Sequence, residues 1–173
     1  MKRKLIALIT LLILFSCSSD DGADMNDDEL PDGTIELTCE TGGMLAEVSG
    51  EFNLDFVALG TSRDEPDGDG YISGSTGQNS FTFKAYQTDE NGNHTHQIEI
   101  SSLTYNGVGV YEDCLVSFND YVSESYYQVD DGTIEVTDID YITNDYGCIS
   151  ITFSGELEGV ITITGELKME TDI

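Results

Sequence analysis

Apolar and polar residues alternate with a period of two along most of the chain after residue 33. The clearest runs are residues 81–86, 97–101, 133–137, 149–153 and 160–164. They are rich in Thr, Ile, Val, Tyr and Phe, and none has the sustained 3.6-residue spacing of a helix. The pattern therefore predicts strands that have one face buried and the other in water.

Turn-forming dipeptides separate these runs at short, even intervals. They are Asp67–Gly68, Asn91–Gly92, Asn106–Gly107, Asp131–Gly132 and Glu158–Gly159. The spacing predicts an all-β fold, an antiparallel β-sandwich or barrel of about eight to ten strands. Residues 33–173 are numerous enough to bury one sizeable core, so we expect them to form a single β domain.

The beginning of the chain has a different pattern. A basic cluster, Lys2 to Lys4, precedes an apolar stretch at residues 5–15 that only Thr10 interrupts. A membrane-spanning helix needs about 20 apolar residues, so this stretch is too short. Its order, basic and then apolar and then small, is typical of a cleaved secretory signal.

The stretch ends in Leu14-Phe15-Ser16-Cys17, which resembles the lipobox of bacterial lipoproteins. Phe15 is bulkier than the usual residue at its position. The resemblance implies that residues 1–16 are a signal peptide and that Cys17 becomes a lipidated N-terminus. The alternative is an ordinary signal peptide that happens to contain a cysteine.

Residues 17–32 follow as an acidic segment that contains hardly any apolar side chain. Low hydrophobicity and charge of one sign predict a disordered tether. Its start, Cys-Ser-Ser-Asp-Asp, resembles Bacteroidota lipoproteins, in which acidic residues near the lipidated cysteine accompany export to the surface. The resemblance implies an outer-membrane lipid anchor that faces the outside of the cell, with the periplasmic leaflet as the alternative.

The strand region resembles a group of small Bacteroidota lipoproteins of unknown function. The likeness covers roughly residues 78–167 and rests on the Gly-Thr-Ile-Glu-Val-Thr run from Gly132 and the Ile-Thr-Phe-Ser-Gly run from Ile151. Thr152 stands where the group's pattern has Gly. The resemblance implies a β domain at the cell envelope and supplies no catalytic residues.

The chain is strongly acidic, with a formal net charge of −28 from 6 basic and 34 acidic residues. Removal of residues 1–16 takes away three of the basic residues and no acidic one. This charge excludes nucleic acid as a partner and opposes adhesion to anionic lipid head groups. We expect the membrane, through the N-terminal lipid, and an unidentified protein or glycan ligand as partners.

An acidic loop is the best candidate for a metal site. Glu65, Asp67, Asp69 and Tyr71 take the spacing of calcium ligands at positions 1, 3, 5 and 7, and Gly70 stands at the sharp turn. Thr76 replaces the acid expected at position 12, and no flanking helices are predicted, so the loop is not an EF-hand. The alternative to a calcium site is a solvated hairpin connection.

Three cysteines remain beyond Cys17. Alternation places Cys39 on the face of Ile35 and Leu37, and Cys114 on the face of Val116, whereas Cys148 lies opposite Ile149. A disulfide between Cys39 and Cys114 is therefore favoured in an oxidising compartment. Three unpaired thiols are the alternative.

Two further clusters of residues have both a structural and a functional interpretation. His94 and His96 would share one face of a strand and suit zinc or copper, but they adjoin a predicted turn that favours solvated side chains. Tyr121, Tyr126 and Tyr127 would suit a glycan or peptide groove, but tyrosine is also a favoured strand residue.

Enzymatic motifs are poorly represented. The sequence has no Gly-x-Ser-x-Gly elbow, no phosphate-binding glycine loop and no evident Cys–His pair. We therefore expect a non-enzymatic binding or assembly module. A glycan hydrolase with two carboxylates is the alternative. A lipocalin-like carrier is disfavoured, because no Gly-x-Trp strand follows the tether.

Lipidation at Cys17 is directly testable. Wild-type protein made in a bacterial host should incorporate labelled fatty acid and fractionate with membranes, because multiple acyl chains hold a protein firmly at a bilayer. Cys17→Ala should lose both properties. A Cys17→Ala protein that still carries label would contradict the prediction.

Overall fold

The computed structural model describes residues 35–61 and 70–173. Over these residues the chain forms nine strands that pair into one antiparallel sheet. The strands are β1 (Gly43–Gly50), β2 (Leu54–Leu59), β3 (Gly70–Thr76), β4 (Phe81–Thr88), β5 (His94–Ser102), β6 (Gly109–Asp120), β7 (Ser125–Thr143), β8 (Tyr146–Leu157) and β9 (Ile161–Asp172). None of the described residues forms a helix long and apolar enough to cross a membrane.

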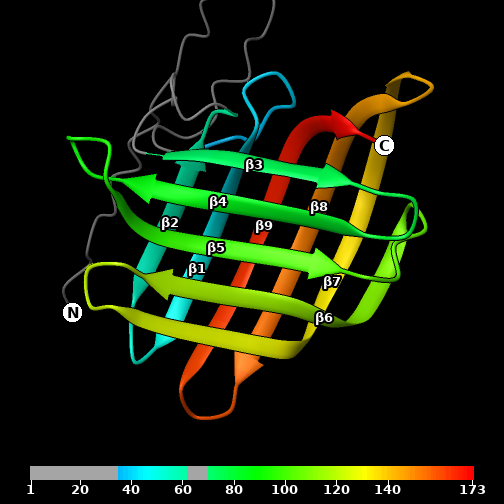
Figure 1. Ribbon diagram of the computed structural model, residues 1–173. Coiled ribbons are helices and arrows are strands. Elements are labelled where there is room, and N and C mark those ends of the chain that lie inside the picture. The colour runs from blue at the N-terminus through cyan, green and yellow to red at the C-terminus, as the bar shows by residue number, and fades with distance from the viewer. Residues whose placement is uncertain (1–34, 62–69) are drawn as a thin grey trace, which may run out of the picture. The chain divides into compact units, whose positions relative to one another are not determined.

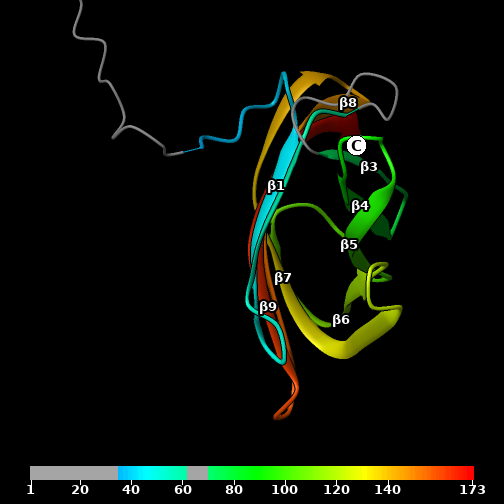
Figure 2. The same cartoon turned by 90° about the vertical axis from the view of Figure 1, so that its left-hand side faces the viewer.

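The sheet curls until its two edges approach each other. The strand order is β2-β1-β9-β8-β7-β6-β5-β4-β3, so β2 and β3 are the edges. Figure 1 shows β3–β6 crossing in front of the other strands, and Figure 2 shows the same two layers from the side. At the seam the Ile72 amide donates a hydrogen bond to the Gly60 carbonyl, with an N–O distance of 2.7 Å. The all-β prediction is thus confirmed, with a nearly closed barrel as its form.

The predicted alternation determines which side chains fill the interior. Along one row of paired positions Phe83, Ile100, Val116 and Val129 all point inward and are buried. The residues between them in sequence point outward and are mostly polar or charged. The largest fully buried side chains are Phe56, Phe81, Phe83, Phe118, Met44, Ile72, Ile98, Ile100, Ile134, Ile149, Ile151 and Ile161.

The turn predicted at Asp131–Gly132 is wrong, because both residues lie inside the 19-residue strand β7. Gly132 marks a close approach between neighbouring strands. A Cβ at this position would lie 2.6 Å from the Val116 side chain and 3.0 Å from the Cys114 carbonyl. The pairing of β6 with β7 shifts register on either side of Cys114, and Asp113 has a φ of 54°. Gly132 therefore permits a bend in β7 against β6.

The other described turn dipeptides do connect strands. Asn91–Gly92 joins β4 to β5, Asn106–Gly107 lies between β5 and β6, and Glu158–Gly159 joins β8 to β9. Their glycines have φ values of 76°, 90° and 71°, which residues that carry a side chain rarely adopt. Asp67–Gly68 lies outside the described residues.

The favoured pairing of Cys39 with Cys114 is also wrong. Cys39 forms a disulfide with Cys148, at a Cα–Cα distance of 5.7 Å, and Cys114 is a buried free thiol. Alternation predicts a strand at residues 35–39, but residues 35–42 do not form one. Cys148 lies on the outer face of β8, whereas Cys114 points into the core, so the Cys39 segment meets Cys148 on the outside of the barrel.

The disulfide should contribute measurable stability. The double substitution Cys39→Ser and Cys148→Ser in residues 33–173 should lower the free energy of unfolding by about 2–4 kcal/mol, because the bond closes a long loop. Urea denaturation measures this value, with Cys114→Ala as the variant that keeps the bond. Peptide mapping without reduction should recover a Cys39–Cys148 linked pair. A linked peptide containing Cys114 would overturn the assignment.

Candidate functional site

The predicted calcium loop is divided between described and undescribed residues. Glu65, Asp67 and Asp69 lie outside the described residues, so the calcium site stays a prediction. Tyr71 lies on the outer side of β3, where its ring stacks on Tyr86 at a centroid distance of 4.9 Å. Its hydroxyl lies 3.0 Å from Nε2 of His94. Residues 35–61 and 70–173 contain no group of three His, Cys, Asp or Glu side chains placed to hold a metal ion.

The two histidines lie on opposite faces of the sheet. Gln87 pairs with His96 and Thr88 pairs with His94, so Thr95 is an extra residue that forms a β-bulge. His94 stacks on Tyr86 on the outer face, at a centroid distance of 4.5 Å. His96 stacks on the buried Phe118 on the inner face. The bulge thus separates the two imidazoles, and they do not share a metal site.

The contacts of His96 indicate a structural role. Its Nδ1 donates to the Gln87 side-chain oxygen at 3.1 Å, and its Nε2 lies 3.7 Å from the Asp120 carboxylate. Burial lowers the pKa of His96, and the charge of Asp120 opposes that shift without cancelling it. Burial alone would raise the pKa of Asp120, but hydrogen bonds from Ser123 and Val122 lower it. Asp120 therefore serves mainly to order the turn after β6.

The three neighbouring tyrosines do not converge on a groove. The hydroxyl of Tyr121 donates to Gln97, that of Tyr126 to Gln128, and that of Tyr127 to Glu51. The Tyr127 ring packs against Phe52 and Phe118. Strand packing and local hydrogen bonds account for all three tyrosines, which agrees with a structural role.

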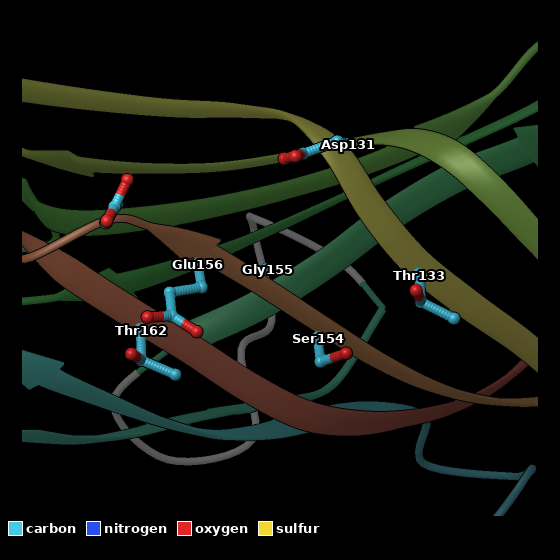
Figure 3. Close-up of a pocket in the computed structure, with 7 residues that line it drawn as sticks. Asp131, Thr133, Ser154, Gly155, Glu156 and Thr162 are labelled. Carbon is cyan, nitrogen blue, oxygen red and sulfur yellow. The ribbon is translucent and has the colours of Figure 1, made fainter.

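One surface hollow, of about 550 Å³, lies on the outer face of β7, β8 and β9. Figure 3 shows its lining side chains, which come from Asp131 and Thr133 on β7, Ser154 and Glu156 on β8, and Thr162 on β9. Glu158 also lines it. Its described lining is acidic or hydroxylic and contains no aromatic ring.

A second hollow, of about 530 Å³, lies at one end of the barrel, and we call it the end hollow. Four segments that are far apart in sequence meet there. Its lining residues are Thr76, Gly77, Gln78, Tyr105, Asn106, Gly107, Tyr141, Asp172 and Ile173. The Thr76 hydroxyl donates to the Asp172 carbonyl, which joins the end of β3 to the end of β9.

Tyr105 is the unusual member of the end hollow. Its side chain is only 6% exposed, and it packs edge-on against Phe81. Among the described residues its hydroxyl is the one buried side-chain polar atom that has no hydrogen-bond partner. Burial raises the pKa of Tyr105, and the nearby Tyr141 and Tyr111 raise it further. The hydroxyl is therefore neutral and able to donate a hydrogen bond.

Sequence patterns do not point to this site. Tyr105 and Tyr141 belong to no cluster of tyrosines, and Asn106 stands out only as part of a turn dipeptide. Leu103 and Val108, on either side of Tyr105, are large apolar residues that stay exposed. Scattered exposed apolar side chains are common, so they give no signal of a site.

The unpartnered hydroxyl can be tested through stability. Tyr105→Phe should raise the free energy of unfolding by about 1 kcal/mol, because an unsatisfied buried polar group is removed. Tyr111→Phe is the matched control. Its hydroxyl accepts a hydrogen bond from the Asn106 amide and donates one to the Gly107 carbonyl, so its removal should cost about 1 kcal/mol. Equal losses in both variants, measured by urea denaturation, would show that Tyr105 already has a partner.

Comparison of the chain with protein-family models, with curated proteins and with solved structures finds no match. The chemistry of the end hollow therefore follows from the side chains that line it.

Proposed function

We propose that this protein is a non-enzymatic binding module, held on the outer face of the outer membrane by a lipid at Cys17, with the end hollow as its ligand site. The resemblance of residues 14–17 to a lipobox supports the anchor. The hollow itself carries the assignment of the site, because four segments far apart in sequence and the exposed Tyr141 line it together.

A buried hydroxyl without a partner costs the folded protein about 1–3 kcal/mol. Such a cost is typical of positions where function, and not stability, determines the residue. The hydroxyl has almost no accessible surface, so a compound in the end hollow does not contact it in this conformation of Tyr105. Phenylalanine would fill the same space beside Phe81 without the cost.

The size and position of the end hollow also support the proposal. Its volume of about 530 Å³ falls within the usual range of roughly 300–1,000 Å³ for small-molecule sites. The inward-facing side chains of the barrel pack against one another as a core, which favours a ligand on the outside over one carried in the lumen. The hollow over β7–β9 offers carboxylates and hydroxyls but no aromatic surface.

Nuclear magnetic resonance can map the site while the ligand is still unidentified. Isotope-labelled residues 33–173 would be titrated with a library of small neutral polar compounds. The backbone signals of Thr76, Asn106 and Tyr141 should shift together, because a bound compound contacts all of the segments that form the end hollow.

Tyr141→Ala should weaken the binding of any such compound by about tenfold, which is typical of an aromatic contact residue. Tyr126→Ala is the matched control, since the two side chains are 59% and 58% exposed. It should leave affinity unchanged. Compounds that bind only at the β7–β9 hollow, or none that shift the end-hollow signals, would overturn the proposed site.

A further inference from the structure

We infer that the ligand of the end hollow is a neutral saccharide, which contacts the ring of Tyr141 and the side-chain amides of Gln78 and Asn106. This inference rests on the proposed function and adds the chemical class of the ligand. It depends on three properties of the hollow: its charge, its hydrogen-bonding groups and its exposed aromatic ring.

The charge of the hollow excludes anions. Its lining contains no Lys, Arg or His, and Asp172 supplies a carboxylate. The whole chain adds a net charge of −28, and such a field repels anionic ligands. A phosphate, a sulfate or an acidic sugar would find no cation to pair with, so a ligand of the end hollow is neutral or positively charged.

The hydrogen-bonding groups favour hydroxyls over ammonium groups. Gln78 and Asn106 each present an exposed side-chain amide, which both donates and accepts hydrogen bonds. A sugar hydroxyl also donates and accepts, so it can pair with an amide in either orientation. A cation would use only the acceptor oxygens of these amides and would leave their N–H donors unused.

Tyr141 supplies the apolar surface that a saccharide requires. The side chain is 59% exposed although it is aromatic and lines the hollow. The face of an aromatic ring carries partial negative charge, and it attracts the weakly positive C–H groups on the flat side of a sugar ring. Gly77 and Gly107 also line the hollow and add no side chains to it, which leaves room for a flat ring.

Isothermal titration calorimetry on residues 33–173 tests the class of ligand. Four panels would be compared: neutral oligosaccharides, uronic-acid oligosaccharides, polyamines and short neutral peptides. We expect binding within the neutral oligosaccharides and none within the other three panels.

Three variants test the contacts. Tyr141→Ala should weaken saccharide binding by about tenfold, and Tyr141→Phe should restore it to within about threefold, because the ring is kept. Gln78→Ala should weaken binding by about fivefold, because it removes an amide that pairs with a sugar hydroxyl. Tyr126→Ala should bind like the wild type.

The outcomes separate the two claims. Peptides or polyamines that bind at the end hollow, with no saccharide bound, would overturn the inference and leave the proposed site standing. Saccharides that bind with equal affinity to Tyr141→Ala, Gln78→Ala and wild type would overturn the assignment of these contacts. No shift at the end hollow with any panel would overturn the inference and the proposed site together.

Discussion

The fold depends on one constraint: a single sheet has to bury its apolar face against itself, because no helix or second sheet is present among the described residues to cover it. The sheet meets this constraint by bending sharply where β6, β7 and β8 lie together. Gly132 and Gly155 lack side chains at the point where both strands approach Val116. This close approach lets the two halves of the sheet face each other, with rows of Phe and Ile between them.

Sequence alone predicted the parts of the fold that depend on local chemistry. Alternation at residues 81–86 and 149–153 identified strands and their buried faces, and Asn91–Gly92 identified a hairpin. Sequence patterns gave wrong predictions where a residue typical of turns instead serves packing between distant parts of the chain. Asp131–Gly132 has the chemistry of a turn, but Gly132 accommodates Val116 instead. The alternation of faces predicted the wrong disulfide, because residues 35–42 do not form a strand and Cys39 meets Cys148 on the outer face of β8.

The candidate site was beyond sequence reasoning for a physical reason. Thr76, Tyr105, Tyr141 and Asp172 are separated by about thirty residues or more in sequence, and only the curl of the sheet brings their segments together. Pattern reasoning weighed clusters that are close in sequence, such as the two histidines and the tyrosines near residue 126. A one-residue bulge at Thr95 separates the histidines. The hydroxyls of the clustered tyrosines donate hydrogen bonds to nearby side chains, whereas the hydroxyl of Tyr105 has no partner.

The disulfide has a mechanical consequence. Cys39 precedes β1 in sequence but is bonded to Cys148 at the start of β8, a strand with neighbours on both sides. Tension applied through the residues before Cys39 therefore enters the sheet at β8 and bypasses β1 (Gly43–Gly50). Without the bond, a pull would load β1 first, and its ladder to β9 would be the one that holds β1 and β2 to the rest of the sheet. With the bond, the load is shared among the ladders on both sides of β8, and β1 with the edge strand β2 stays unstressed.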